Sequence, residues 1–236
     1  MEKFVCTVLA FLSIIFSLSS FAEPECVIIL HGFGQTNRAM APIKTFLQDY
    51  NYKVINVTYP SRTYDIENLA NLKIKPQLTQ CLNQAEKVHF VGYSMGGVIA
   101  RYIIENNAIK NLGKVVLIAS PIKGSDISSK LSKNSMFKFL FGPAVADLAS
   151  DSILLKNLKK NVSYPVGIIT ASKSHNPITS LFLLPGKNDG TVTLASTEIE
   201  GLRDRISIDA NHNSVIYLKE THQQILNFIK LGRFVK

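Results

Sequence analysis

The stretch Val88–Gly97, which reads VHFVGYSMGG, decides how the rest of the chain is interpreted. It begins as an apolar run typical of a buried strand, gives the pattern G-x-S-x-G around Ser94, and continues into a helical pattern over 96–106. A serine on a sharp turn between a strand and a helix needs glycines on either side, because larger residues would collide there. The start of the helix also favours negative charge near this serine. The alternative interpretation is a glycine-rich helix start with Ser94 as its cap.

Outward from this stretch, apolar runs rich in β-branched residues alternate with amphipathic runs. The expected strands are 26–30, 52–59, 87–92, 114–119, 166–171 and 205–208, and the expected helices are 41–50, 66–85 with a break or restart at Pro76, 96–106 and 218–231. Strands this apolar are typically buried on both faces. Their alternation with helices predicts an α/β fold with a mostly parallel central sheet and helices on both faces. No repeat or linker divides the segment 23–236, which we expect to form a single domain.

A serine hydroxyl is a weak nucleophile and needs a histidine base that is oriented by a carboxylate. After a serine turn of this kind, the acid and then the histidine follow along the chain. Asp189 is the only acid of a polar turn over 185–192, and His212 lies in the loop between the last strand and the final helix. We therefore expect Ser94, Asp189 and His212 to form a catalytic triad. Less favoured candidates are His89, His175 and His222 for the base and Asp147, Asp151 and Asp209 for the acid.

The second half of the predicted site is a pair of backbone amides that would stabilise an oxyanion. One amide belongs to Met95, the residue after the expected nucleophile. The other is expected at Phe33, because the first strand ends in His31–Gly34, which reads HGFG and turns sharply on two glycines.

Taken together, these motifs resemble the lipase-like, serine esterase branch of the α/β-hydrolase superfamily, over almost all of 26–236. The matching landmarks are HGFG at 31–34, YPS at 59–61, FVGYSMGG at 90–97, NDGTV at 188–192 and His212. The resemblance implies the α/β-hydrolase fold and cleavage of carboxylic esters by the triad without a cofactor. At 121–124 the chain reads PIKG, whereas many relatives have histidine after the proline, and this departure concerns the shape of the lid and pocket.

The amino terminus has the pattern of a secretory signal peptide over residues 1–22. Lys3 precedes an apolar run from Phe4 to Leu18, and Ser20 and Ala22 provide the small residues of a cleavage site. A membrane-spanning helix needs about 20 apolar residues, and this run is shorter and interrupted by serine and threonine. We therefore expect an exported protein, periplasmic or secreted.

Export would change how the cysteines are interpreted. Cys6 would leave with the signal peptide, so Cys26 and Cys81 would remain as an even pair in an oxidising compartment. We predict a disulfide between them, with two unrelated buried thiols as the alternative.

The segment from 124 to 158 interrupts the alternation of strands and helices, and we expect it to be a lid-like insertion. Its apolar cluster, helped by 181–184, is expected to cover or line an acyl pocket, with ordinary core packing as the alternative. The cluster consists of Met136, Phe137, Phe139, Leu140 and Phe141. Around it Lys123, Lys130, Lys133 and Lys138 outnumber Asp126, so this segment suits contact with an anionic membrane surface.

The whole chain of 236 residues carries a formal net charge of +9, and removal of 1–22 leaves this value unchanged because Glu2 and Lys3 leave together. The basic residues are dispersed without a recognised motif, which argues against nucleic acid as a partner. We expect no metal, since the turn at 188–190 offers a single carboxylate. The leading prediction is an exported serine hydrolase of small or lipid esters. Acyl transfer or phospholipase activity with the same triad, and a non-catalytic ligand-binding protein, stay open, and the oligomeric state is undetermined.

Overall fold

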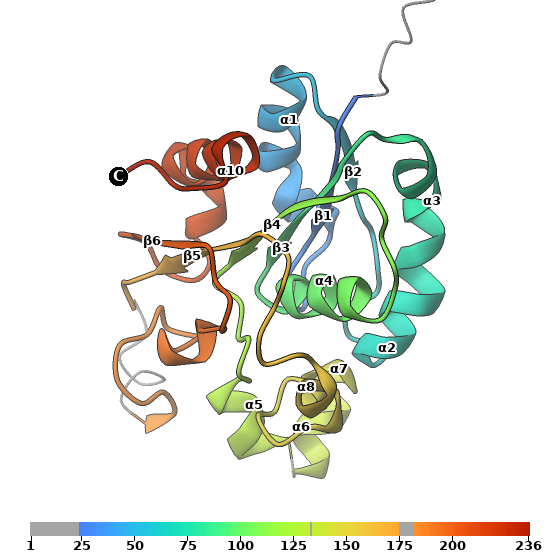
Figure 1. Cartoon of the computed structure of the whole chain (residues 1–236). Helices are drawn as coiled ribbons and strands as arrows, with labels where there is room; N and C mark the ends of the chain where they lie inside the picture. The colour runs from blue at the N-terminus through green and yellow to red at the C-terminus, as the bar shows by residue number, and fades with distance from the viewer. Residues whose placement is uncertain (1–23, 133, 175–181) are drawn as a thin grey trace, which may run out of the picture.

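The computed structural model describes residues 24–132, 134–174 and 182–236 (Figure 1). The predicted signal peptide, Lys133, His175 and Leu181 lie outside these ranges, as does the side chain of Lys138. Six strands form one parallel sheet in the order β2-β1-β3-β4-β5-β6. They are β1 (Cys26–Leu30), β2 (Lys53–Asn56), β3 (Val88–Tyr93), β4 (Leu112–Ile118), β5 (Val166–Ala171) and β6 (Asp204–Ile208). The predicted parallel sheet is confirmed.

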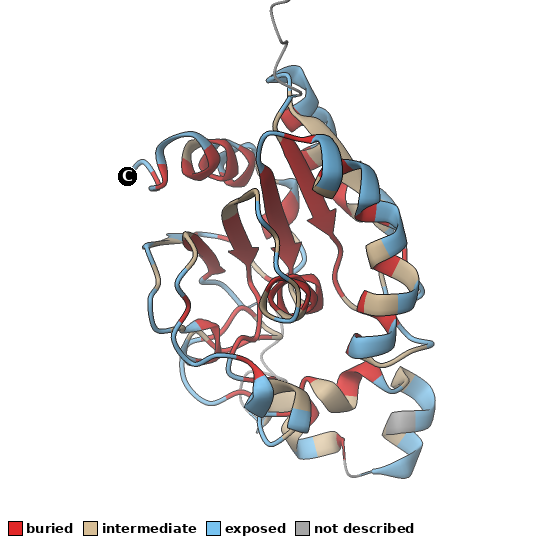
Figure 2. Ribbon diagram, turned by 45° about the vertical axis from the view of Figure 1, so that its right-hand side comes forward, coloured by how far each residue is buried: buried red, intermediate tan, exposed pale blue. Residues whose placement is uncertain are grey.

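Helices cover both faces of this sheet, as the sequence predicts (Figure 1). One face packs on α1 (Ala41–Asp49) and α10 (Lys219–Leu231), and the other on α3 (Lys75–Gln84) and α4 (Met95–Glu105). Alternate residues of β1 enter opposite cores, because successive side chains of a strand point to opposite faces. Figure 2 shows the central strands buried and the outer helix surfaces exposed. Short 3₁₀ helices in the described connections are η1 (Asn37–Met40), η3 (Ala195–Thr197) and η4 (Val215–Tyr217).

Most elements lie within two residues of their predicted limits, and two of them need comment. The second strand ends at Asn56 instead of continuing to residue 59. The backbone amide and carbonyl of Thr58 are both hydrogen-bonded to the Gln77 side chain, so they do not extend the sheet. The expected helix over 66–85 is continuous, with α2 (Ile66–Asn68) passing through the π-helical η2 (Leu69–Ile74) into α3. Pro76 lies in the first turn of α3, the position where a proline without an amide hydrogen is tolerated. The break or restart expected at Pro76 is not seen, because the chain changes from π-helix to α-helix at Lys75 and stays helical through Pro76.

The segment over 124–158 folds into short helices beyond the ends of the strands, on the side toward which they point (Figures 1 and 2). They are α5 (Asp126–Leu131), α6 (Ser135–Phe141), α7 (Ala144–Asp147) and α8 (Ile153–Asn157). On α6 the side chains of Met136, Phe139 and Leu140 are 63%, 84% and 57% exposed. Exposure of this size distinguishes α6 from an ordinary core helix.

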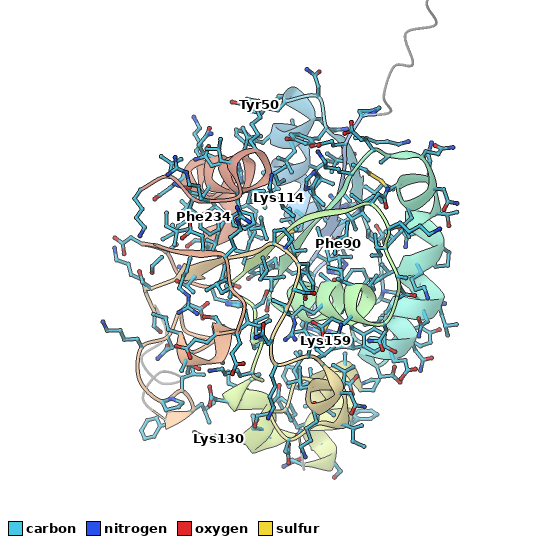
Figure 3. The ribbon with its side chains drawn as sticks, in the orientation of Figure 1. Tyr50, Phe90, Lys114, Lys130, Lys159 and Phe234 are labelled. Carbon is cyan, nitrogen blue, oxygen red and sulfur yellow. A yellow bond between two sulfur atoms is a disulfide. The ribbon has the colours of Figure 1, made fainter. Side chains whose placement is uncertain are left out.

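Cys26 of β1 and Cys81 of α3 are joined by a disulfide, visible beside α3 in Figure 3, with 5.8 Å between their Cα atoms. Both residues are fully buried in the core on the α3 and α4 face. The disulfide therefore ties the first strand to the helix that covers it. Within the described ranges, none of the helices is both long and apolar enough to span a bilayer.

Candidate active site

Ser94 lies on the turn between β3 and α4 with a backbone φ of 53°, which is uncommon for a residue other than glycine. Gly92 and Gly96, on either side of Ser94, must be glycines because other parts of the backbone pass too close for a side chain. A Cβ atom on Gly92 would lie 2.5 Å from the Cα atom of Gly97, and one on Gly96 would collide with the carbonyl oxygens that end β1. The turn thus holds Ser94 in a strained conformation and leaves it half-buried at the start of α4.

The neighbouring strand brings a second loop to Ser94. β1 and β3 are adjacent and parallel, and the chain passes from β1 to β2 on one side before it returns to β3 on the other. Such a reversal of strand order marks the place, beyond the carboxyl ends of β1 and β3, where open α/β sheets bind ligands. The loop at 31–34 and the turn at Ser94 both follow these strand ends and lie side by side, since a Cβ atom on Gly32 would be 3.3 Å from the Cβ atom of Ser94.

A continuous chain of hydrogen bonds joins the three residues predicted to form the triad. The Ser94 Oγ atom lies 3.1 Å from Nε2 of His212, and Nδ1 of His212 lies 2.7 Å from Oδ2 of Asp189. An ionised carboxylate only accepts hydrogen bonds, so the Nδ1 proton is directed at Asp189 and Nε2 accepts from the serine hydroxyl. This is the arrangement in which a histidine base activates a serine nucleophile.

The Asp189 carboxylate is fixed from its other side by the turn that carries it. Asp189 is 3% exposed, and its Oδ1 atom accepts the amides of Thr191 and Val192 at 2.9 and 2.7 Å. Its backbone carbonyl accepts the amide of His212 at 3.0 Å. Asp189 therefore orients both the backbone and the imidazole of His212.

Tyr93 makes a contact to this site that the sequence reasoning missed. Its hydroxyl donates to the backbone carbonyl of His212 at 2.9 Å, and its ring lies 5.2 Å from the imidazole between centroids. Tyr93 is 1% exposed, and burial raises the pKa of its hydroxyl well above the usual range. The hydroxyl therefore stays a neutral donor. The signal in the sequence was the aromatic residue directly before the serine of the turn.

The predicted oxyanion amides belong to the loop after β1 and to the start of α4. Among the described residues, neither the Phe33 amide nor the Met95 amide donates a hydrogen bond to the protein. The loop is held by its neighbour, since the Gly34 amide donates to Ser61 Oγ at 2.9 Å and Gly34 has a φ of 70°. Both amides are thus available to an oxygen atom of a ligand.

The histidine of this loop is a buried support. The His31 ring stacks on the Tyr59 ring with 3.9 Å between centroids, and the Tyr59 hydroxyl donates to the His31 carbonyl. Burial lowers the pKa of His31 and raises that of Tyr59. This pair fixes the backbone just before the Phe33 amide.

Side chains of α6 reach the loop after β1. The Phe141 ring lies 6.1 Å from the Phe33 ring and 4.5 Å from the Phe137 ring, between centroids. The Arg62 guanidinium lies 5.4 Å from the centroid of the Phe33 ring. Of the five apolar residues singled out in this segment, Phe141 therefore lies against Phe33 of the loop at 31–34, Phe137 packs on Phe141, and the other three are exposed.

The less favoured candidates have structural contacts of their own. His89 accepts the Lys114 amide at 2.9 Å and bonds to Glu25 at 3.1 Å, and burial lowers its pKa. His222 bonds to the Ile216 carbonyl at 2.8 Å inside the core. The two acids with contacts elsewhere are Asp147, which accepts the Ile66 amide, and Asp209, which pairs with Lys173 at 2.7 Å.

The helices of 124–158 are connected to the turn that carries Asp189. Thr193 is 2% exposed, and its hydroxyl donates to the Asp126 carboxylate at 2.9 Å. Lys123 donates its amide to the Ser196 carbonyl at 2.8 Å and pairs its ammonium group with Glu198 at 2.8 Å. Lys123 is therefore partly neutralised and contributes less than expected to the positive charge of this segment.

The fold and this site define an α/β-hydrolase of the lipase-like branch. The family model described as palmitoyl protein thioesterase matches residues 26–165, and the chain belongs to this family. No curated protein sequence gives a significant match.

Solved structures of lipases and esterases share the fold. A Bacillus licheniformis lipase in mature form superposes with a TM-score of 0.67 at 18% identity, over 91% of this chain and 93% of that one. An esterase from Pyrococcus furiosus gives 0.62 at 17% identity, over 88% and 82%. The phospholipase PlaB from Legionella pneumophila gives 0.67 at 14% identity, over 90% of this chain and 60% of that one.

Proposed function

We propose that the protein is a serine hydrolase that cleaves carboxylic esters through an acyl-enzyme on Ser94. The observation that carries this proposal is the hydrogen-bonded chain from the Ser94 hydroxyl through His212 to Asp189, with distances of 3.1 and 2.7 Å. In this proposal Ser94 attacks the ester carbonyl while His212 takes its proton and Asp189 stabilises the imidazolium. The amides of Phe33 and Met95 then bind the oxygen of the tetrahedral intermediate.

The second half of the proposed cycle reverses these roles. His212 gives the proton to the departing alcohol, which leaves an ester between the acyl group and Ser94. Water then loses a proton to His212 as it attacks the acyl carbonyl, and release of the acid returns that proton to Ser94. If an alcohol or amine takes the place of water, the same residues would carry out the acyl transfer kept open above.

We further propose that the acyl group is long and that the substrate is met at a lipid surface. The exposed side chains of Met136, Phe139 and Leu140 support this, because apolar side chains grouped in this way mark interaction sites. Phe182, which is 70% exposed, adds to them, and the Lys130 ammonium group bonds to its carbonyl at 3.3 Å. The segment would cover or line the acyl pocket from the side of α6 and would contact an anionic membrane.

A thioester is the second candidate substrate, and the family match favours it. The family carries the name palmitoyl protein thioesterase, which pairs a long acyl chain with a thiol as the leaving group. The proposed mechanism changes only in the leaving group, because a thiolate needs less help from His212 as an acid. An oxygen ester and a thioester with the same acyl chain would therefore rank the two candidates.

The first experiment tests whether Ser94 is the nucleophile. We expect a fluorophosphonate probe to label the purified chain of residues 23–236, and Ser94→Ala to abolish labelling and lower ester hydrolysis by about 10⁴- to 10⁶-fold. Ser207→Ala, which removes an exposed serine of β6, is the matched control and should leave both unchanged. A native protein that is neither labelled nor active on any ester would support the non-catalytic binding protein instead.

The second experiment identifies the substrate class. Hydrolysis would be followed on 4-nitrophenyl esters from acetyl to palmitoyl, on a palmitoyl thioester of a cysteine peptide, and on phospholipid in anionic vesicles. Higher kcat/KM with longer acyl chains and a gain on vesicles would support the lipid-surface proposal. Activity confined to acetyl and butyryl esters, and indifferent to vesicles, would contradict it and leave a short-chain esterase. Acylated alcohol among the products would identify acyl transfer.

Export belongs to the proposal as well. The disulfide between Cys26 and Cys81 supports it, because such bonds persist in oxidising compartments. Expression of the full chain should release a protein whose first residue is Glu23 into the periplasm or the medium. Intact mass and amino-terminal sequencing would check this, and an uncleaved chain retained in the cell would contradict it.

A further inference from the structure

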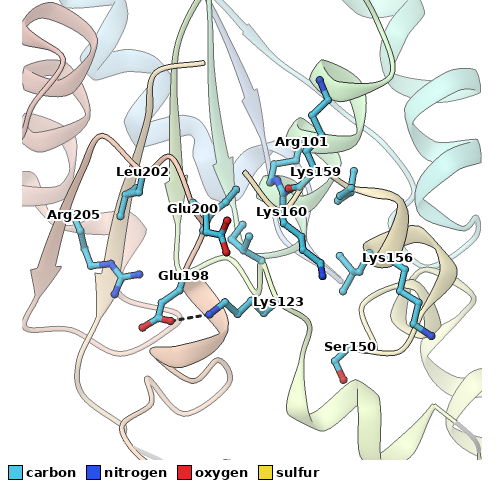
Figure 4. A pocket seen from close by; sticks show the side chains of 14 residues that line it. Arg101, Lys123, Ser150, Lys156, Lys159, Lys160, Glu198, Glu200, Leu202 and Arg205 are labelled. Carbon is cyan, nitrogen blue, oxygen red and sulfur yellow. Dashed lines mark hydrogen bonds and ion pairs between the residues drawn. The ribbon is translucent and has the colours of Figure 1, made fainter. Parts of the chain in front are cut away.

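A second cavity lies away from Ser94, on the face of the sheet that α4 covers (Figure 4). Its volume is about 620 Å³, which falls in the range of small-molecule sites. It lies between the segment 155–160, which includes the end of α8, and the segment 198–205, which includes the start of β6. None of its lining residues belongs to the proposed triad or carries a proposed oxyanion amide. The cavity is therefore separate from the candidate active site.

Positive charge dominates the lining of this cavity. Two cations are already paired, since Arg101 bonds to Glu105 at 2.9 Å and Lys123 to Glu198 at 2.8 Å. The other lining cations are Lys156, Lys159, Lys160 and Arg205. Among the described residues, none of these four has a carboxylate within 4.0 Å, and Glu200 is the one acid of the lining that is likewise without an ion pair. The pKa of the Glu198 carboxyl is lowered by the Lys123 hydrogen bond and also by the charge of Arg205, so the excess of positive charge comes mainly from the exposed lysines at 156, 159 and 160.

Arg205 contributes a hydrogen-bond donor to this positively charged lining. Its Nε atom is buried and has no hydrogen-bond partner in the described part of the chain. An unsatisfied buried donor is costly, so a ligand oxygen that approached this guanidinium would be favoured. Figure 4 shows Arg205 beside Glu198 at one side of the cavity, with Lys156 and Lys160 at the other side. Cations therefore flank the space from both sides.

Apart from Ser150, the uncharged part of the lining is apolar. The apolar residues are Ile122, Leu155, Leu158, Ile199 and Leu202. Ile122 and Leu158 are 5% and 6% exposed, so they form a fixed wall continuous with the core on the α4 face. A small inorganic anion would leave this wall in contact with water, whereas an acyl chain would cover it and gain about 25 cal/mol for each Å² that it buries.

We propose that this cavity binds a single-chain anionic amphiphile, namely a long-chain fatty carboxylate. The chain packs on the leucines and isoleucines, and the carboxylate is held by the lysines at 156–160, with Arg205 adding positive charge from the other side of the cavity. This is a binding site outside the candidate active site, and it does not depend on the hydrolase activity proposed above.

Calorimetry with monomeric dodecanoate tests the proposal on the full mature chain. We expect saturable binding that weakens at least about tenfold in the double variant Lys156→Glu with Lys160→Glu, since a tenfold loss needs only about 1.4 kcal/mol. The matched control is Lys110→Glu with Lys219→Glu, which makes the same charge change at exposed lysines outside the lining. The control should bind as the parent does, and all three proteins should unfold at the same temperature. Absence of binding, or equal weakening in both variants, would overturn the proposal.

Two further probes separate the contribution of the acyl chain from that of the carboxylate charge, and a third locates the site. Dodecanol and inorganic phosphate should each bind at least about tenfold more weakly than dodecanoate. Equal binding of either would overturn the proposal that the ligand is an anionic amphiphile. A dodecanoate analogue with a diazirine on its chain should crosslink to 155–160 or 198–205. Crosslinks confined to the neighbourhood of Ser94 and 136–141 would place the bound chain in the candidate active site and would overturn the second site.

Discussion

The two regions that meet at the candidate site are built differently. The loops after β1, β3, β5 and β6 carry the candidate site. β1, β3 and β5 are buried along their whole length, and the side chains of Ser94, Asp189 and His212 are fixed by hydrogen bonds of 2.7 to 3.1 Å. The helices of 124–158 are short and expose large apolar side chains, of which Phe139 is 84% exposed. We call the first region the catalytic platform and the second the insertion.

The difference teaches how such a protein divides its tasks. Geometry on the platform is over-determined, because Ser94 keeps a positive φ only while the glycines beside it let α4 approach β1. The insertion also has close backbone approaches, at Gly124 and Gly142, but it differs in presenting exposed apolar side chains that suit an apolar partner. We therefore expect changes on the platform to act on the chemistry, and changes on the insertion to act on substrate presentation.

The largest effect is expected for Asp189→Asn on the platform. The amide would keep the shape of the side chain but favour the wrong imidazole tautomer, so kcat should fall about 10⁴-fold. Esterase kinetics on a soluble 4-nitrophenyl ester would measure this. The matched control is Asp209→Asn, since Asp209 is an exposed acid that pairs with Lys173. A fall of less than tenfold for Asp189→Asn would mean that this carboxylate does not orient His212.

The next effect is expected on the insertion, for the double change Phe139→Ser with Leu140→Ser. Each side chain contributes about 1.5 to 3 kcal/mol when it is fully buried, so hydrolysis of a vesicle-bound ester should fall by at least about tenfold. Because both side chains are exposed, the free energy of unfolding should change by less than about 0.5 kcal/mol for each substitution. Hydrolysis of a soluble acetyl ester should stay within about twofold, because the platform is unchanged.

The control for the insertion removes two apolar side chains that are exposed elsewhere. Leu72 and Val235 are 59% and 47% exposed, so Leu72→Ser with Val235→Ser tests whether any loss of surface hydrophobicity has the same result. Sedimentation with anionic vesicles would measure binding directly. Equal loss in both double variants would contradict a membrane-facing role for α6.

A smaller effect is expected for Tyr93→Phe, which removes the hydroxyl that bonds to the His212 carbonyl at 2.9 Å. One hydrogen bond of this kind is worth about 1 kcal/mol, so kcat should fall about fivefold with KM nearly unchanged. The pH dependence of kcat should shift as well, because Tyr93 would act by positioning the base. Tyr164→Phe removes a hydroxyl bonded to Glu105 and serves as the matched control. An unchanged kcat and pH profile would reduce Tyr93 to a packing role.

The catalytic platform was predicted from the sequence because local sequence patterns determine most of its structure. A strand, a serine between glycines and a helix form one continuous pattern at 88–97, and the strands β1 and β5 match their predicted limits. The acid and histidine were predicted from chain order, and the structure brings both to Ser94. The disulfide followed from an even count of cysteines and is present.

What the sequence could not give are contacts between residues distant along the chain. The Tyr93 hydroxyl reaches a carbonyl at residue 212, and the cationic cavity combines Arg101 with segments near 158 and 202, with no pattern linking them. The early end of β2 has the same cause, since the side chain of Gln77 competes for the backbone of Thr58. The sequence also could not show which side chains of α6 face the protein, because Phe141 packs on Phe33, which is distant along the chain.

The smallest effect concerns the contact that joins the two regions, the hydrogen bond from Thr193 to Asp126 at 2.9 Å. Thr193→Val keeps the shape of the side chain but leaves the Asp126 carboxylate without this donor, so the free energy of unfolding should fall by about 1 kcal/mol. Thr79→Val, which removes an exposed hydroxyl from α3, is the matched control. If the platform is independent of the insertion, kcat on a soluble ester should change by less than about twofold. A tenfold fall at unchanged stability would show instead that the insertion helps to set the turn that carries Asp189.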